Sequence, residues 1–267
     1  MDYTIDKVSA DAFSMEYLRF GNGKKAFVIL PGLSIQSVMF SAPAIVKQYE
    51  RFTEDFTVYV FDRRQELPPV YKVSDMAEDT VKAINILGLR DISVFGASQG
   101  GMIALTIAAD NPSLVCRVAV ASTVLRIDEK SFSVIDEWIR LAGNGDREGL
   151  YLSFGQKIYS QETYEKYKDA LISIAKTVTE KELERFVILA KGAQGFDLSG
   201  KADSIRCPVL IAGDTEDAVF GIEYTDELAK NICPGRDFTM NIYTGYGHAV
   251  YDMAPDFMTS LFIFMKG

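Results

Sequence analysis

The sequence of 267 residues predicts an α/β fold with a mostly parallel sheet. Three observations predict it. Short apolar runs rich in β-branched residues alternate with stretches of helical spacing, as in βαβ units with right-handed crossovers. This alternation stops at about residue 125, gives way to helical spacing alone, and resumes at residue 205. A Gly-x-Ser-x-Gly segment at residues 96–100 joins one apolar run to one helical stretch.

The elements before the interruption follow from local patterns. Residues 14–20 alternate apolar and polar side chains and end at a glycine-containing turn at 21–23, which predicts a strand that enters a hairpin. Ser74 is expected to be the N-cap of a helix that ends at Gly88. Residues 62–69 are polar and contain two prolines, which predicts a loop. The remaining elements are buried strands at 25–30, 56–61, 92–95 and 115–122 and helices at 36–50 and 101–109.

Residues 125–200 are expected to form a helical insertion. Apolar positions recur there at helical spacing, no strong strand pattern is present, and aromatic residues are frequent. We expect three or four helices that act as a lid, with most rings packing the insertion's own core and a few facing a pocket beneath it. The chain then divides into a core at 1–124 and 201–267 and a lid at 125–200. Beyond the insertion, strands are expected at 205–213 and 238–243, a helix at 222–231 and a closing helix at 252–265.

The composition excludes several classes of protein. Hydrophobic residues make up 48% and charged residues 24%, as in ordinary globular proteins. The formal net charge is −9 and no basic run is present, which argues against a nucleic-acid partner. The three cysteines, Cys116, Cys207 and Cys233, are far apart, so neither a disulfide framework nor a zinc site is expected. No signal-peptide pattern and no membrane-length apolar run is present, so we expect a cytoplasmic protein without a membrane partner.

Ser98 is the candidate nucleophile. In a Gly-x-Ser-x-Gly turn between a strand and a helix, the serine takes a strained backbone conformation, and a side chain on either flanking glycine would clash with neighbouring backbone. The turn pushes the hydroxyl clear of the sheet and brings the first N–H groups of the helix close to it, where they can bind a developing oxyanion. The alternative interpretation is a tight turn with an incidental serine.

A serine hydroxyl is a weak nucleophile unless a base takes its proton and an acid orients that base. His248 is the only histidine of the chain and follows a predicted strand in a loop that contains glycine. The loop after the preceding strand offers three carboxylates, Asp214, Glu216 and Asp217, of which two are expected only to cap the next helix. The order serine, acid, histidine along the chain is the order found in α/β hydrolases.

With this order of residues, the chain resembles the α/β-hydrolase fold superfamily, in its lid-bearing branch of serine esterases and C–C bond hydrolases. The resemblance implies an eight-stranded, mostly parallel sheet flanked by helices, with a helical lid inserted after the sixth strand. It places the nucleophile on Ser98 and the base on His248, and it favours Asp217 as the acid. Asp214 is the reserve acid. The segments that carry the resemblance are residues 30–33, 96–100, 207–213, 217–219 and 247–248.

The resemblance also assigns the oxyanion hole to the backbone N–H groups of Leu33 and Gln99. In this chain Pro31 stands before Gly32, at a position where the family often has histidine. Because the donors belong to the main chain, this departure changes the shape of the loop without removing a donor.

A second loop departs further from the family pattern. Residues 62–68 stand where the family has a glycine-rich Asp-x-Arg-Gly-x-Gly-x-Ser loop, so one wall of the expected pocket differs and the substrate cannot be transferred from the family. Arg63 or Arg64 could bind an acidic group of a substrate. A surface role in water or beside an aspartate is the favoured interpretation of both arginines.

The sequence therefore predicts a metal-independent serine hydrolase that cleaves an ester-like bond of a small molecule through an acyl-enzyme, without a cofactor. The same residues could catalyse C–C bond hydrolysis or acyl transfer. A ligand-binding receptor on the same fold is the alternative from another class. Ser98 excludes the chemistry of epoxide hydrolases and haloalkane dehalogenases, which need a carboxylate nucleophile. Nothing in the sequence predicts the physiological substrate or the oligomeric state.

Overall fold

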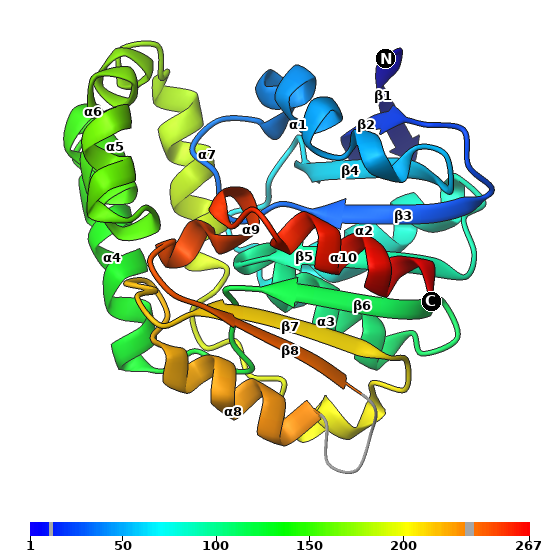
Figure 1. Ribbon diagram of the computed structural model, residues 1–267. Coiled ribbons are helices and arrows are strands. Elements are labelled where there is room, and N and C mark those ends of the chain that lie inside the picture. Colours follow the sequence, from blue (N-terminus) through cyan, green and yellow to red (C-terminus); the bar gives the residue numbers. More distant parts are fainter. Residues whose placement is uncertain (11–12, 233–237) are drawn as a thin grey trace.

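Eight strands among the described residues form one sheet in the order β1-β2-β4-β3-β5-β6-β7-β8 (Figure 1). The computed structural model describes residues 1–10, 13–232 and 238–267. The pairs β1–β2 and β2–β4 are antiparallel and every other pair is parallel, which confirms the predicted mostly parallel sheet. The carboxyl ends of the parallel strands therefore meet at one edge. The strands are β1 (Tyr3–Ala10), β2 (Phe13–Phe20), β3 (Lys25–Leu30), β4 (Phe56–Arg64), β5 (Ile92–Ala97), β6 (Val115–Ala121), β7 (Val209–Asp214) and β8 (Phe238–Tyr243).

Helices cover both faces of the sheet (Figure 1). In β5 every residue is buried: Ile92 and Val94 pack into one hydrophobic cluster, and Phe95 and Ala97 pack into the other. A strand that is covered on both faces has a continuous run of apolar residues, and for this reason the sequence predicts β5 well. The first cluster includes α2 (Val73–Ile86), α3 (Gln99–Asp110) and α8 (Ile222–Ile232), and the second includes α1 (Ala42–Gln48), α9 (Val250–Met253) and α10 (Phe257–Lys266).

Four helices lie between β6 and β7, in a part of the chain that the structure describes completely. They stand beside the sheet at the carboxyl ends of its parallel strands (Figure 1). Each begins at a residue whose side chain accepts a backbone N–H from the first turn: Asp128, Asp146, Ser160 and Thr179. The number of helices agrees with the expectation, and their division from the core as a lid stays a prediction. They are α4 (Glu129–Gly143), α5 (Arg147–Ile158), α6 (Gln161–Ala175) and α7 (Glu180–Lys191).

The insertion leaves and rejoins the core at one place, which we call the neck. The Leu198 N–H donates to the Leu125 carbonyl over 3.0 Å, and the Ile127 N–H donates to the Phe196 carbonyl over 2.7 Å. An antiparallel bridge lies between these two bonds. The two ends of the insertion are therefore held side by side by backbone hydrogen bonds.

Two predictions about the first strands are wrong. The turn at residues 21–23 does not join a hairpin, because β2 pairs with β1 and β4, and β3 lies on the far side of β4. β1 was not predicted, because its residues are almost all exposed at the sheet edge and therefore show no buried alternation. In addition, β4 continues through Arg64, which lies opposite Met15, so residues 62–64 belong to a strand and not to the predicted loop.

Smaller differences concern the ends of elements. Ser74 lies within the first turn of α2, and Lys72 is the N-cap. The strand expected at 205–213 begins at Val209. The closing helix is divided into α9 and α10 on either side of Pro255, whose ring nitrogen cannot donate a helical hydrogen bond.

Two of the cysteines, Cys116 and Cys207, are free, and Cys233 lies outside the described residues. Burial raises the pKa of the Cys207 thiol to about 11, so little thiolate is present at neutral pH and the group is a poor nucleophile. Among the helices of the described ranges, none combines the length and the apolar character needed to cross a bilayer.

Candidate active site

Ser98 forms the turn between β5 and α3 in a backbone conformation that L-residues rarely adopt, with φ 52° and ψ −121°. A β-carbon on Gly96 would lie 2.6 Å from the carbonyl carbon of Gly100. A β-carbon on Gly100 would lie 2.5 Å from the carbonyl oxygen of Pro31. Strand, helix and loop therefore approach too closely for a side chain, which confirms the predicted clash at both flanking glycines.

Gly100→Ala is expected to lower the free energy of unfolding by about 2–4 kcal/mol, because the added methyl group overlaps the backbone of the neighbouring loop. Gly143→Ala is the matched control, since that glycine ends α4 with no atom within 4 Å of the added carbon. It is expected to be neutral or to stabilise by up to about 1 kcal/mol. Urea denaturation measures both changes, and equal free energies for the two variants would contradict a tight turn.

Two backbone N–H groups near Ser98 donate no backbone hydrogen bond within the described residues. Gln99 is the first residue of α3, so its N–H has no acceptor within the helix. The Leu33 N–H donates no backbone hydrogen bond within the described part of the chain. The loop that carries Leu33, residues 31–37, lies against the serine, because a β-carbon on Gly32 would be 3.2 Å from Ser98 Cβ. Such donors can bind an oxygen that becomes negative during a reaction.

The structure brings His248 and Asp217 into direct contact. His248 Nδ1 lies 2.9 Å from Oδ1 and 2.8 Å from Oδ2 of Asp217, and both side chains are only 3% exposed. Asp217 Oδ1 also accepts the N–H groups of Val219 and Phe220, each over 2.9 Å, and these bonds fix the position of the carboxylate. Because carboxylate oxygens accept hydrogen bonds, this contact assigns the proton to Nδ1 and leaves Nε2 as the acceptor.

Asp214, the reserve acid, has different partners. Its two carboxylate oxygens accept the N–H of Glu216 over 2.8 Å and the N–H of Tyr246 over 3.1 Å. The side chain is fully buried, and within the described chain it makes no hydrogen bond to His248. Asp214 therefore links the end of β7 to the loop before the histidine.

His248 and Ser98 reach the same sheet edge on different elements. His248 lies in the short 3₁₀ helix η4 (Gly247–Ala249), which packs against β7, whereas Ser98 follows β5, two strands away. Within the described residues, the half-buried Ser98 hydroxyl makes no hydrogen bond. Hydrogen bonds between catalytic groups are often long before substrate binds. The structure thus joins the histidine to an acid directly and leaves the serine hydroxyl free.

Arg63 is not the surface residue that the sequence analysis favoured. It is 4% exposed, and its Nη2 donates to the Pro31 carbonyl over 2.8 Å. Burial lowers the pKa of the Arg63 guanidinium, and the adjacent Asp62 carboxylate opposes this shift. Arg64 lies 3.4 Å from Asp79, as the alternative of a pair with an aspartate predicted. No local pattern indicates the partner of Arg63, which is 32 positions away in the chain.

Parts of the insertion lie against both candidate loops, which are the Ser98 turn with Gln99 and the loop at Gly247 that carries His248. The Gln99 side chain donates to the Leu189 carbonyl of α7 over 2.7 Å. A β-carbon on Gly247 would lie 3.0 Å from the carbonyl oxygen of Ile158, at the end of α5. The expectation that most rings pack within the insertion agrees with an aromatic cluster of Trp138, Phe154 and Phe186, in which the first two ring centroids are 4.4 Å apart.

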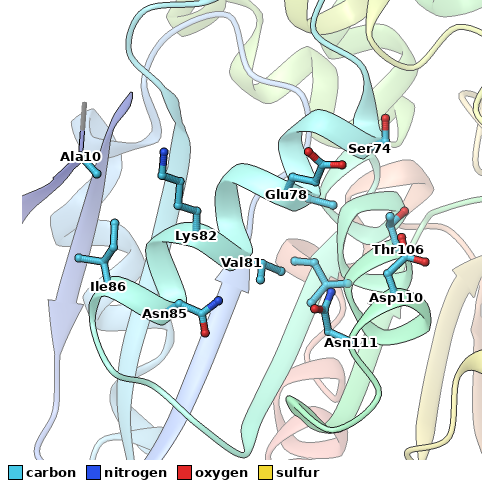
Figure 2. Close-up of a pocket in the computed structure, with 12 residues that line it drawn as sticks. Ala10, Ser74, Glu78, Val81, Lys82, Asn85, Ile86, Thr106, Asp110 and Asn111 are labelled. Carbon is cyan, nitrogen blue, oxygen red and sulfur yellow. The ribbon is translucent and has the colours of Figure 1, made fainter. Parts of the chain in front are cut away.

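A groove of about 710 Å³ lies elsewhere, between α2 and α3 (Figure 2). Lys82 and Asn85 line it on one side, and Thr106 and Asn111 line it on the other. These last two residues belong to the end of α3 opposite to Ser98, so the groove is separate from the candidate site. Across the described ranges, no group of three or more His, Cys, Asp or Glu side chains is arranged to hold a metal ion.

The chain is similar to known proteins in its sequence and in its structure. The sequence model of the alpha/beta hydrolase fold family matches residues 25–255. A protein named putative carbamate hydrolase RutD, from Caulobacter vibrioides, is 26% identical over 253 residues, which cover 92% of this chain and 91% of that protein. The human protein named serine hydrolase BPHL is 22% identical over 272 residues, covering 96% of this chain and 86% of that one.

Two solved structures have the same fold. MGS-M2, an alpha/beta hydrolase enzyme from a deep-sea metagenome library of the Medee basin, superposes with a TM-score of 0.86 at 22% identity, covering 98% of this chain and 97% of that one. The enol-lactonase of Burkholderia xenovorans LB400 superposes with a TM-score of 0.81 at 17% identity, covering 98% and 100%. At these identities the structural likeness shows the fold alone.

Proposed function

The chain belongs to the alpha/beta hydrolase fold family, and from this premise we propose that it is a hydrolase in which Ser98, His248 and Asp217 act as nucleophile, base and acid. One observation carries the proposal: the only histidine of the sequence contacts a buried carboxylate at the sheet edge where the strained Ser98 turn lies. A base that is held and oriented by an acid is what a serine hydroxyl needs to become a nucleophile.

In the proposed reaction, His248 Nε2 takes the hydroxyl proton while Ser98 Oγ attacks a carbonyl carbon of the substrate. Asp217 accepts the Nδ1–H and stabilises the imidazolium that forms. The N–H groups of Leu33 and Gln99 bind the oxyanion, and each contributes roughly 3 kcal/mol. His248 then protonates the leaving group. Finally it activates a water molecule, which hydrolyses the acyl-enzyme and restores the serine.

A small molecule with an ester-like bond is the proposed substrate. The names carbamate hydrolase and enol-lactonase, given to two similar proteins, both describe cleavage at a carbonyl carbon bonded to oxygen or nitrogen. Residues 125–200 would form a lid over the core at 1–124 and 201–267, and the contacts of α5 and α7 with the candidate loops support this. C–C bond hydrolysis and acyl transfer begin with the same attack, so a panel of substrates separates them.

The folded protein is expected to react with a fluorophosphonate probe and to carry the adduct on Ser98, because the probe traps an activated serine and mimics the tetrahedral state. Peptide mass spectrometry locates the adduct, and heat-denatured protein serves as the control. A folded protein that stays unlabelled and turns over no p-nitrophenyl ester would contradict the proposal and favour the ligand-binding receptor.

A further inference from the structure

The 31–37 loop is held at both ends by side chains from the end of β4. At its first residue, the Pro31 carbonyl accepts a hydrogen bond of 2.8 Å from Arg63 Nη2. At its last residue, Ser37 Oγ donates to Asp62 Oδ2 over 2.6 Å. Asp62 and Arg63 are 7% and 4% exposed, so water competes little for these bonds.

Helix α7 of the insertion reaches the same cluster through Arg185. The Arg185 guanidinium donates to the carbonyl oxygens of Arg64 and Arg63, over 2.7 and 3.2 Å. It also lies 3.4 Å from Asp62 Oδ1, in an ion pair whose side chains are 21% and 9% exposed. The Asp62 carboxylate is therefore bonded to the 31–37 loop and to α7 at the same time.

Two further hydrogen bonds join α7 to the segments that carry the Leu33 and Gln99 N–H groups. Glu182, about one turn before the arginine, accepts from Gln36 Nε2 over 3.1 Å. The Leu189 carbonyl accepts from Gln99 Nε2 over 2.7 Å. Gln36 belongs to the 31–37 loop and Gln99 supplies the second N–H. One helix of the insertion is thus bonded to both parts of the proposed oxyanion hole.

We propose that Arg185 is a positioning residue that fixes the 31–37 loop, and with it the Leu33 N–H, from the insertion. Asp62 is a buried carboxylate, and Arg185 is the cation of its ion pair. Without that cation the buried carboxylate loses its ion pair and its bond to α7, so it no longer holds the Ser37 hydroxyl in one fixed position. The catalytic consequence rests on the proposed function, whereas the attachment of the loop to α7 does not.

Arg185→Met tests the proposal, with Arg147→Met as the matched control. Arg147 also lies in the insertion and makes contacts of the same kind, donating to the Val178 carbonyl over 2.8 Å and pairing with Glu180 at 2.9 Å, but these partners all belong to the insertion. Arg185→Met is expected to lower kcat for p-nitrophenyl acetate about 10- to 100-fold and to change KM less than about threefold, because a misplaced donor acts on the transition state. Arg147→Met is expected to keep kcat within about twofold of the wild type.

Ser37→Ala is a second test that leaves α7 intact. It removes the hydroxyl between Asp62 and the loop, so kcat is expected to fall in the same direction. The rate of amide hydrogen exchange in the 31–37 peptide is measured in the wild type and in each variant, in addition to kcat. Exchange is expected to be faster than in the wild type in both Arg185→Met and Ser37→Ala, and to be unchanged in Arg147→Met.

Hydrogen exchange that is unchanged in both Arg185→Met and Ser37→Ala would overturn the proposal. A loss of kcat in Arg147→Met as large as the loss in Arg185→Met would also overturn it. Faster exchange with unchanged kcat in an active enzyme would overturn the positioning role. If the wild-type protein neither hydrolyses esters nor reacts with the fluorophosphonate probe, the proposed function fails. In that case hydrogen exchange of the 31–37 peptide alone tests whether α7 anchors the loop. Faster exchange in Arg185→Met supports this anchor, and unchanged exchange refutes it.

Discussion

Replacing Ser98 by alanine is expected to lower kcat/KM for p-nitrophenyl acetate by at least about 10⁴-fold, because no other group can form the acyl-enzyme. Substrate binding and the oxyanion donors remain, so a small residual rate above the uncatalysed reaction is expected. The melting temperature is expected to stay within about 2 °C of the wild type, since the Ser98 hydroxyl makes no hydrogen bond in the part of the chain that the structure describes.

Ser98→Gly separates the loss of the nucleophile from the strain of the backbone. A φ of 52° costs a residue with a β-carbon roughly 1–2 kcal/mol and costs glycine almost nothing. The glycine variant is therefore expected to be as inactive as the alanine variant and to unfold at a higher temperature. Turnover above about 1% of the wild-type rate in either variant would exclude Ser98 as the nucleophile.

The second large effect is expected at the base and its acid. His248→Ala is expected to cost about as much kcat/KM as Ser98→Ala, and the double variant should be no worse, because the two groups act as one unit. Asp217→Asn is expected to cost about 10³- to 10⁴-fold, since an amide neither stabilises the imidazolium nor keeps the proton on Nδ1. Initial rates at saturating and limiting substrate measure all of these losses.

Asp214→Asn is the matched control for the acid. Asp214 is buried like Asp217 and accepts two backbone N–H groups, but it lies against the loop before the histidine and not against the histidine ring. This variant is expected to lower the melting temperature and to keep kcat/KM within about tenfold, because its losses are structural. If folded Asp214→Asn loses as much activity as Asp217→Asn, the assignment of the acid is wrong.

The parts of the structure that depend on local sequence could be predicted. The Ser98 turn follows from an apolar run, two flanking glycines and a helix of small residues, all within about 20 positions. The meeting of His248 with an acidic loop follows from the rule that parallel strands place their carboxyl ends at one edge. Local spacing left two aspartates open, and the structure separates them by their partners: Asp217 contacts the ring, and Asp214 accepts the Tyr246 N–H.

The parts that depend on distant contacts could not be predicted. β1 carries its exposed residues at a sheet edge, and among the described strands it pairs with β2 alone. The burial of Arg63 depends on a carbonyl of the 31–37 loop, and the contacts of Arg185 with residues 62–64 span more than 120 positions. Composition and periodicity describe one element at a time, so they cannot show which elements share a hydrogen bond.

The neck has a consequence for how this protein can change during evolution. Because backbone hydrogen bonds tie Leu125 to Leu198 and Ile127 to Phe196, the core is closed beneath the insertion whatever lies between these points. The entropy of closing such a segment grows only slowly with its length, so the helices that precede α7 can be gained, lost or exchanged there at little cost in closure entropy, whereas α7 is bonded to the core through Arg185 and Leu189. Selection for new substrates can therefore act on this one segment while the rest of the molecule is conserved.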